Sequence, residues 1–168
     1  MIVKPKCLAI IFIFTKRQIH TMIKRKSTKK IILHCSATRE GQDVRAKTIR
    51  EWHKQRGFED IGYHYVIDLD GKIEKGRDEK MVGAHCVGQN SDSIGICYIG
   101  GCDKSMNAKN TLSDAQKHAL VDLVYVLLEN YHLTIKDVHC HNEYANKACP
   151  SFKIDWFIEE YEKAFNLP

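Results

Sequence analysis

Several features that would place the chain in a special class are missing from its 168 residues. It has three prolines, no low-complexity tract and no internal repeat, which excludes collagen-like, solenoid and largely disordered architectures. Its longest apolar run, CLAIIFIF, has eight residues and is far too short to span a bilayer, so we expect no stable membrane insertion. With 43% hydrophobic and 28% charged residues, the composition is that of one globular domain.

A regular set of cysteines is also missing. The seven cysteines are an odd number with irregular spacing, whereas secreted disulfide scaffolds are usually shorter and carry even sets. We therefore expect reduced cysteines in a protein that is made in the bacterial cytoplasm.

The main body of the chain lacks a basic excess. The formal net charge is +5, and its positive residues are concentrated in the first thirty positions: Lys4, Lys6, Lys16, Arg17, Lys24, Arg25, Lys26, Lys29 and Lys30. A nucleic-acid-binding domain would need a basic face on the fold itself, so we expect no nucleic-acid partner. The distribution suits a basic tail at residues 1–28, or weak attraction to an anionic polymer.

The N-terminal residues have the outline of a signal peptide without its end. MIVKPK and the apolar run CLAIIFIF are followed by TKRQIH, which offers no small-residue cleavage site. Our interpretation is that translation starts at Met22, with export by a weak N-terminal signal as the alternative. We place the functional domain at residues 29–168.

Predicted strands alternate with predicted helices. The strands are 29–37, 93–101 and 135–141, a hairpin covers 62–76 around an Asp70-Gly71 turn, and the helices are 46–57, 113–131 and 152–165. The helix at 113–131 has the strongest start signal, because Ser113 and Gln116 form a capping-box pattern. This alternation predicts an α/β fold, a single domain with a central mixed β-sheet flanked by helices.

Three side chains suggest a metal site. His34 lies near the end of the first strand, His141 ends the last one, and Cys149 follows in the loop beyond it. If the strand ends converge, they form a His/His/Cys set that leaves one position open, as in catalytic zinc sites. From spacing alone, Cys149 could equally be a nucleophile, half of a disulfide or a small buried residue.

Six motifs follow one another in a recognisable order. They are HCSAT at 34–38, GYHY at 62–65, GRDE at 76–79, VGAH at 82–85, NSDSIGI at 90–96 and KACPSF at 147–152. Together they resemble the zinc-dependent N-acetylmuramoyl-L-alanine amidases of the phage-lysozyme and peptidoglycan-recognition-protein superfamily, and most of all the short phage lysozymes that are amidases. The resemblance covers residues 30–160.

The resemblance implies a fold, an activity and a partner. It implies the peptidoglycan-recognition-protein fold and hydrolysis of the amide bond between N-acetylmuramic acid and L-alanine in bacterial peptidoglycan, which degrades the cell wall. It also implies one Zn²⁺ per chain, a monomer, and a phage-derived endolysin that acts on the wall after release from the cytoplasm.

The resemblance further implies roles for individual residues. Zinc is assigned to His34, His141 and Cys149, and catalytic roles are assigned to Tyr63 and Lys147. A bound zinc ion activates water and polarises a carbonyl. Lys147 can stabilise the oxyanion, and Tyr63 can donate to it or help to move a proton.

Substrate contacts are predicted near the cleft. His85 and Asn90 lie in the loop that, by the resemblance, borders the groove for the peptide stem, and His64 and Arg77 are predicted nearby. The alternatives for these residues are loop polarity or an ion pair of Arg77 with Asp78 or Glu79.

Two departures from the family pattern concern the ligand region. Cys140 precedes His141 where relatives have glycine or histidine, and Asn146 replaces a proline common before the lysine. His139 would point the same way as His141 by the strand period, so either could ligate; the eight-residue spacing to Cys149 favours His141.

Two other functions remain open. Cys149 could be the nucleophile of a cysteine amidase, since ACPSF precedes a predicted helix. The chain could also be a peptidoglycan-binding module without catalysis, although such modules typically lack the zinc cysteine.

Overall fold

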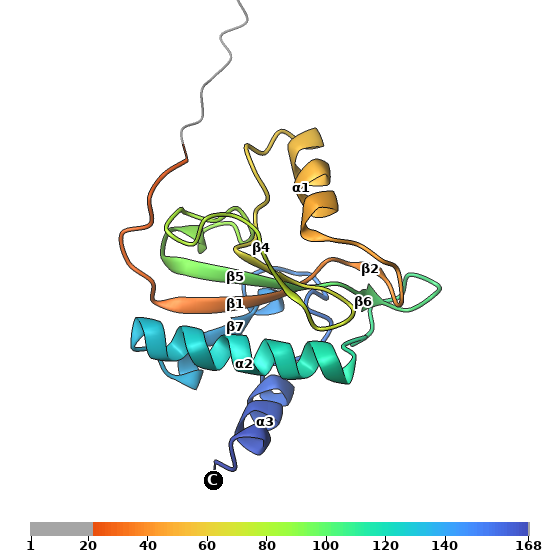
Figure 1. The fold of residues 1–168 in the computed structure, drawn as a ribbon, viewed down its shortest axis with the longest axis vertical. Coiled ribbons are helices and arrows are strands. Elements are labelled where there is room, and N and C mark those ends of the chain that lie inside the picture. The colour runs from red at the N-terminus through yellow and green to blue at the C-terminus, as the bar shows by residue number, and fades with distance from the viewer. Residues whose placement is uncertain (1–21, 168) are drawn as a thin grey trace, which may run out of the picture.

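The computed structural model describes residues 22–167 (Figure 1). The predicted weak signal within residues 1–21 lies outside these residues, and the predicted start at Met22 stays a prediction. The central sheet has five strands in the order β4-β3-β5-β1-β7. They are β1 (Lys30–Cys35), β3 (Tyr65–Ile67), β4 (Ile73–Lys75), β5 (Ser93–Tyr98) and β7 (Val138–Cys140).

The sheet is mixed, as predicted. Strands β3, β5, β1 and β7 run parallel, and only β4 pairs antiparallel with β3 among the described strands. The β3–β4 hairpin turns at Asp70-Gly71, where Gly71 has a φ of +81° that suits glycine. A separate pair of short strands, β2 (Thr38–Arg39) and β6 (Gly101–Cys102), extends beyond the carboxyl ends of β1 and β5.

Helices cover both faces of the sheet. Helix α2 (Asp114–Tyr131) lies along one face with α3 (Ile154–Ala164) beside it, and α1 (Ala46–Gln55) lies on the other side (Figure 1). The predicted capping box of α2 is confirmed, because the Ser113 hydroxyl accepts from the Gln116 N–H while the Gln116 side chain accepts from the Ser113 N–H.

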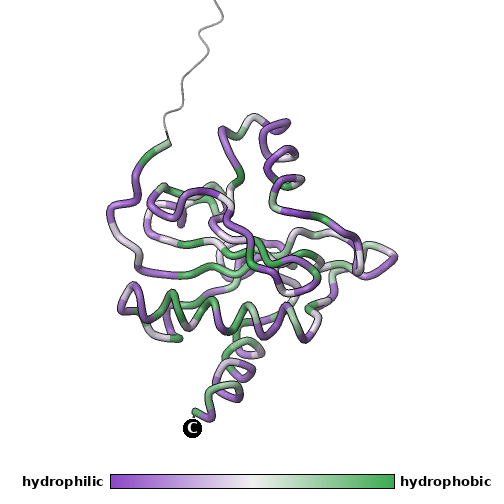
Figure 2. Tube along the Cα trace, viewed as in Figure 1, coloured by the Kyte–Doolittle hydropathy of each residue, from purple (hydrophilic) through white to green (hydrophobic). Residues whose placement is uncertain are grey.

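Alternating side chains of β1 divide the core. Ile31, Leu33 and Cys35 pack toward α2 and α3 in the larger of two apolar clusters. Because neighbouring strand residues point to opposite faces, His34 is directed to the face that carries α1. Apolar residues are concentrated in the central strands (Figure 2), and burying each large aliphatic side chain contributes about 1.5–3 kcal/mol.

The last strand is shorter than predicted. Residues 135–141 were expected to be extended, but β7 comprises only Val138–Cys140, between 3-10 turns at Ile135–Asp137 and His141–Glu143. His141 is therefore the first residue of a turn and does not end the strand. Both turns have a carboxylate, Asp137 or Glu143, that accepts from a backbone N–H at the turn's start, which stabilises the turn over extended chain.

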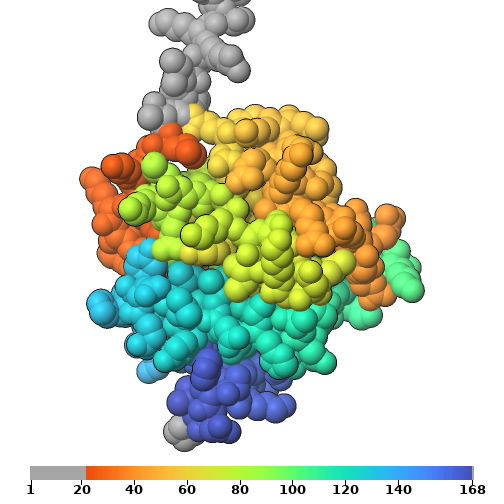
Figure 3. All heavy atoms as spheres, in the orientation of Figure 1, coloured from red at the N-terminus to blue at the C-terminus, as the bar shows by residue number. Residues whose placement is uncertain are grey.

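Part of the predicted tail contacts the domain. The Arg25 N–H donates to the Lys80 carbonyl, and the Val82 N–H donates to the Ile23 carbonyl. Lys24 and Met81 form an isolated antiparallel β-bridge. In the space-filling view this segment lies against the rest of the molecule (Figure 3). Among residues 22–167, no helix combines the length and apolarity that crossing a bilayer requires.

Candidate metal centre and active site

The parallel strands bring the three predicted ligands together. Strands β1 and β7 are neighbours that end at the same edge of the sheet, where α/β proteins commonly bind ligands. His34 is the last residue but one of β1, His141 follows β7 directly, and Cys149 lies in the loop that returns over this edge. The ligand atoms of His34, His141 and Cys149 all lie within 4.8 Å of one another.

The spacing and chemistry of this cluster fit a zinc ion. Tetrahedral zinc with bonds of about 2.0–2.3 Å to nitrogen and sulfur separates its ligand atoms by roughly 3.3–3.6 Å. The Cys149 Sγ lies 3.7 Å from the His34 Nδ1, and the rings of His34 and His141 have centroids 4.6 Å apart. Two imidazoles and a thiol are also the ligand types that zinc prefers.

The electrostatics favour neutral imidazoles. Burial lowers the pKa of His34 well below its ordinary value, and His85, His141 and Lys147 lower it further. Burial, followed by Lys147, also lowers the pKa of His141. Because a metal binds the unprotonated ring nitrogen, both side chains are ready to ligate at neutral pH.

The surroundings of Cys149 suit a metal ligand. Its sulfur accepts from the Cys35 N–H at 3.3 Å. Hydrogen bonding with the Cys35 thiol, followed by burial, raises the pKa of Cys149 above its ordinary value. A catalytic thiol needs a lowered pKa, whereas a metal displaces the proton on binding.

His139 and Cys140 lie outside the ligand cluster. His139 shares the sheet face of His34 but pairs in register with Ile32, two residues before His34, and its Nδ1 contacts Glu143 at 3.1 Å. Cys140 is completely buried on the opposite face of the sheet, in the larger apolar cluster, which packs toward α2 and α3. Neither therefore competes with His141 for a metal held by the other two ligands.

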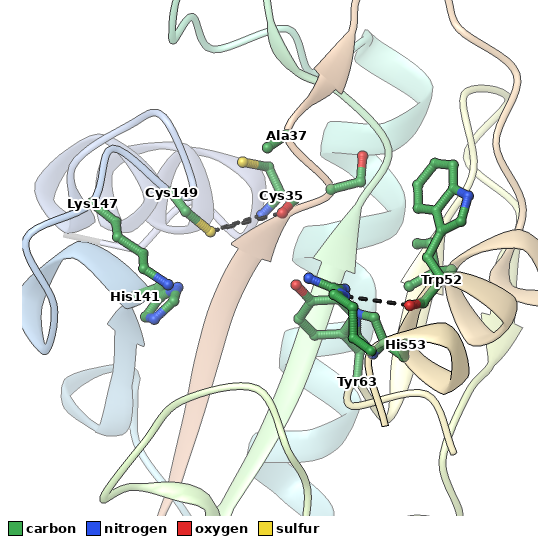
Figure 4. A pocket seen from close by; sticks show the side chains of 11 residues that line it. Cys35, Ala37, Trp52, His53, Tyr63, His141, Lys147 and Cys149 are labelled. Atoms are coloured by element: carbon green, nitrogen blue, oxygen red, sulfur yellow. Dashed lines mark hydrogen bonds between the residues drawn. The ribbon is translucent and has the colours of Figure 1, made fainter. Parts of the chain in front are cut away.

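A pocket of about 240 Å³ opens beside the cluster (Figure 4). Its lining residues are Cys35, Ser36, Ala37, Ile49, Trp52, His53, Arg56, Tyr63, His141, Lys147 and Cys149. The view shows His141, Lys147 and Cys149 on one side and Trp52 with His53 on the other, with Tyr63 between them. The two predicted catalytic residues and two of the predicted ligands thus share one pocket.

Tyr63 and Lys147 differ in their environments. Tyr63 is half-buried, its ring centroid is 5.2 Å from that of His34, and burial raises the pKa of its hydroxyl well above the ordinary value. It therefore remains a neutral hydrogen-bond donor at neutral pH. Lys147 is exposed in the loop before Cys149.

Two of the predicted substrate contacts, His64 and Arg77, are buried and do not line this pocket. His64 accepts from the Gly95 N–H at Nδ1, and its Nε2 lies 3.0 Å from the Met81 carbonyl. Arg77 donates to the carbonyls of Asp60, Ile61 and Val82. The guanidinium of Arg77 thus bonds to backbone carbonyls, in place of the ion pair with Asp78 or Glu79 that the sequence suggested. Substrate contact by His64 or Arg77 stays a prediction.

His85 and Asn90 also make bonds within the protein. His85 is 9% exposed and contacts the His34 ring, 3.0 Å from its Nδ1 to the Nε2 of His34. The Asn90 side-chain oxygen accepts from the N–H groups of His85 and Cys86. Their contact with a substrate is likewise still a prediction.

Sequence reasoning missed several residues at the site. Cys35 lies in HCSAT, directly after a predicted ligand, which could have marked it. His53 is buried on α1, and its Nδ1 accepts from the Gly62 N–H. Trp52 has no comparable signal; it is 36% exposed and lines the pocket.

The fold and the cluster define a single-domain α/β protein with a candidate metal centre beside an open pocket. A family model described as N-acetylmuramoyl-L-alanine amidase matches residues 24–152. The chain belongs to this family and is an enzyme of the class that hydrolyses the bond between N-acetylmuramic acid and L-alanine.

Curated relatives include endolysins of phages. The endolysin of Escherichia phage T7 is 42% identical over 139 residues, which cover 83% of this chain and 91% of that protein. The endolysin of Klebsiella phage KP32 has the same identity and coverage. The six cysteines within residues 22–167 are free thiols in the structure, and their reduced state in the cell stays a prediction.

Solved structures share the fold. An endolysin N-acetylmuramoyl-L-alanine amidase from Clostridium intestinale superposes with a TM-score of 0.73 at 28% identity, covering 88% of this chain and 90% of that one. The Drosophila peptidoglycan recognition protein SD has a TM-score of 0.66 at 20% identity, covering 77% and 79%, which shows a common fold. The predicted family resemblance and fold are thereby confirmed.

Proposed function

We propose that the chain is a zinc-dependent amidase in which His34, His141 and Cys149 hold one zinc ion. The observation that carries this proposal is the convergence of these three side chains at the edge of a pocket that Tyr63 and Lys147 also line. A zinc ion bound there would supply a Lewis acid and an activated water for amide hydrolysis.

Tyr63 and Lys147 would act on the negative charge that develops on the carbonyl oxygen. The raised pKa of Tyr63 keeps its hydroxyl protonated at neutral pH, so that it can donate a hydrogen bond. Lys147 supplies a positive charge from the opposite loop. Donors aimed at a developing oxyanion typically contribute about 10²–10³ in rate, which makes both residues candidates for transition-state stabilisation.

We further propose that the substrate is the peptidoglycan of a bacterial host and that the chain acts as a monomeric, phage-derived endolysin. The support comes from the phage endolysins that it resembles over most of their length. Synthesis in the cytoplasm, release to the wall and the domain boundary at residue 29 stay predictions.

Metal analysis combined with a wall-hydrolysis assay tests the proposal. We expect one zinc ion per chain, loss of stem-peptide release after treatment with a strong chelator, and recovery on adding zinc. A cysteine-nucleophile amidase would keep its activity in chelator. A binding module would bind purified walls without releasing peptide at any zinc concentration.

A further inference from the structure

The His85 ring is held against the candidate ligand His34 because the backbone of Gly83 and Gly95 lies directly beside it. A Cβ built on Gly95 would lie 2.6 Å from two carbons of the His85 ring, and a Cβ on Gly83 would lie 2.5 Å from it. Only glycine at these two positions leaves room for the imidazole. The Asn90 side chain accepts from the His85 N–H at 2.9 Å and so holds its backbone. The ring consequently has little freedom to move.

The Gln89 carbonyl shows which hydrogen atoms the Ser93 hydroxyl and the His85 ring contribute to their hydrogen bonds. The Ser93 hydroxyl lies 2.7 Å from the Gln89 carbonyl, which can only accept, so the serine proton points there. The Ser93 Oγ also lies 3.3 Å from the His85 Nε2. With its one proton already committed, Ser93 can only accept from this nitrogen, which must therefore carry a hydrogen.

The same logic continues to His34. His34 and His85 are 1% and 9% exposed, and among the described residues neither pairs with a carboxylate, so a charged ring would be buried without a partner and each neutral ring has one N–H. If the His85 hydrogen is on Nε2, its Nδ1 is an acceptor. The His34 Nε2 lies 3.0 Å from that Nδ1 and must be the donor. The unprotonated nitrogen of His34 is then Nδ1, which faces the Cys149 sulfur at 3.7 Å.

We propose that His85 is a positioning residue that, together with Ser93 and the Gln89 carbonyl, fixes the His34 tautomer with Nδ1 free to bind metal. This inference rests on the proposed zinc function and adds to it a determinant of metal affinity. His85 acts through His34, and the structure gives it a role other than the substrate contact predicted from the sequence. The relay is the set Gln89, Ser93, His85 and His34.

The first experiment reads the tautomers in the metal-free protein. Two-dimensional NMR that correlates the ring nitrogens with the ring carbon-bound protons distinguishes an N–H nitrogen from an unprotonated one. We expect Nε2–H and unprotonated Nδ1 on both His34 and His85 at neutral pH. A hydrogen on Nδ1 of His34, or a doubly protonated His85, would overturn the relay.

The second experiment uses two amide substitutions of similar size. In His85→Asn the side-chain oxygen can occupy the position of Nδ1 and still accept from His34, whereas in His85→Gln the amide reaches the position of Nε2. We expect His85→Asn to bind Zn²⁺ within about threefold of the parent. We expect His85→Gln to bind it about 10–100-fold more weakly, the usual effect of losing an outer partner of a ligand.

Competition with a chromophoric chelator measures the Zn²⁺ affinity, and His118→Gln on the exposed surface of α2 serves as the control. With zinc saturating, the KM for wall fragments should match the parent in every variant. A raised KM with unchanged zinc affinity in His85→Gln would instead identify His85 as a substrate contact. If the parent binds no zinc, the proposed function fails, while the NMR measurement still tests the relay.

Discussion

The two walls of the site are built differently. The buried wall consists of His34, His85 and Ser93, which are at most 9% exposed and bond to one another in a chain that ends on a backbone carbonyl. The open wall consists of Tyr63, His141, Lys147 and Cys149, which line the pocket.

We infer that the buried wall positions the ligands, whereas the open wall takes part in the reaction. Side chains on the buried wall have their protein partners already in place, so they can fix a tautomer and a ring orientation without contacting substrate. Side chains on the open wall face the pocket, where we propose that the reaction takes place. His34 belongs to the buried wall, but its Nδ1 faces Cys149 on the open wall, so His34 connects the two walls.

Removing one of the three proposed ligands should have the largest effect, because the zinc ion would lose a bond. We expect His141→Ala to abolish both stoichiometric zinc and stem-peptide release, since two ligands hold zinc far more weakly than three. His139→Ala, two residues earlier, should keep both. Elemental analysis and the wall assay on this pair test the assignment, and the reverse result would move the ligand to His139.

Changes on the open wall that spare the ligands should rank second. We expect Tyr63→Phe and Lys147→Ala each to lower kcat by about 10²–10³-fold, because each removes a donor or charge that acts on the transition state. Bound zinc should remain stoichiometric in both. Loss of zinc in either variant would show that the residue supports the metal site instead of the reaction.

Crowding the buried wall should have a smaller effect on activity. Gly95→Ala places a Cβ 2.6 Å from the His85 ring, and overpacking of this kind costs about 1–3 kcal/mol of folding free energy. We expect weaker zinc binding in addition, since the ring must shift away from His34.

Gly88→Ala is the matched control for that substitution. An added Cβ at Gly88 meets nothing within 4 Å, but φ is +80° there. It should therefore cost about 1–2 kcal/mol in backbone strain and leave zinc affinity unchanged. Chemical denaturation and chelator competition on both variants would separate the two effects, and equal zinc affinities would contradict the proposed crowding of His85.

The smallest effect on the site itself is expected from mild acid, which acts through His64, outside the proposed ligand set. Burial lowers the pKa of His64 to about 4, with Arg25 and Arg77 lowering it further while the Met81 carbonyl and Glu79 oppose the shift. The unfolded chain takes up this proton near pH 6.5 and the folded protein does not, so stability is unaffected above pH 6.5 and falls from there toward pH 4. The loss from His64 is roughly 2 kcal/mol at pH 5.

His64→Asn isolates that contribution, because its side-chain oxygen can still accept from the Gly95 N–H in place of Nδ1. Urea unfolding at pH 7 and pH 5 should show a smaller acid-induced loss of stability in the variant than in the parent. Equal losses would mean that His64 titrates normally in the folded protein.

The sequence determined much of the local structure and named the three candidate ligands. Periodicity and the Ser113–Gln116 capping pattern predict α2, and the Asp70-Gly71 turn predicts the hairpin, because these signals depend on neighbours along the chain. The six ordered motifs likewise identify the family. The predicted strand at 135–141 was too long, since local patterns do not reveal the side-chain bonds that convert its two ends into turns.

Only the tertiary structure decided how the site is arranged. His34 and Cys149 are 115 positions apart, and the parallel pairing of β1 with β7 is what brings their loop ends together. The buried wall is equally non-local, because Gly83 and Gly95 make room for His85 from two different segments. A sequence lists the histidines that could bind a metal, but the hydrogen-bond partners that set each ring's free nitrogen exist only after the chain has folded.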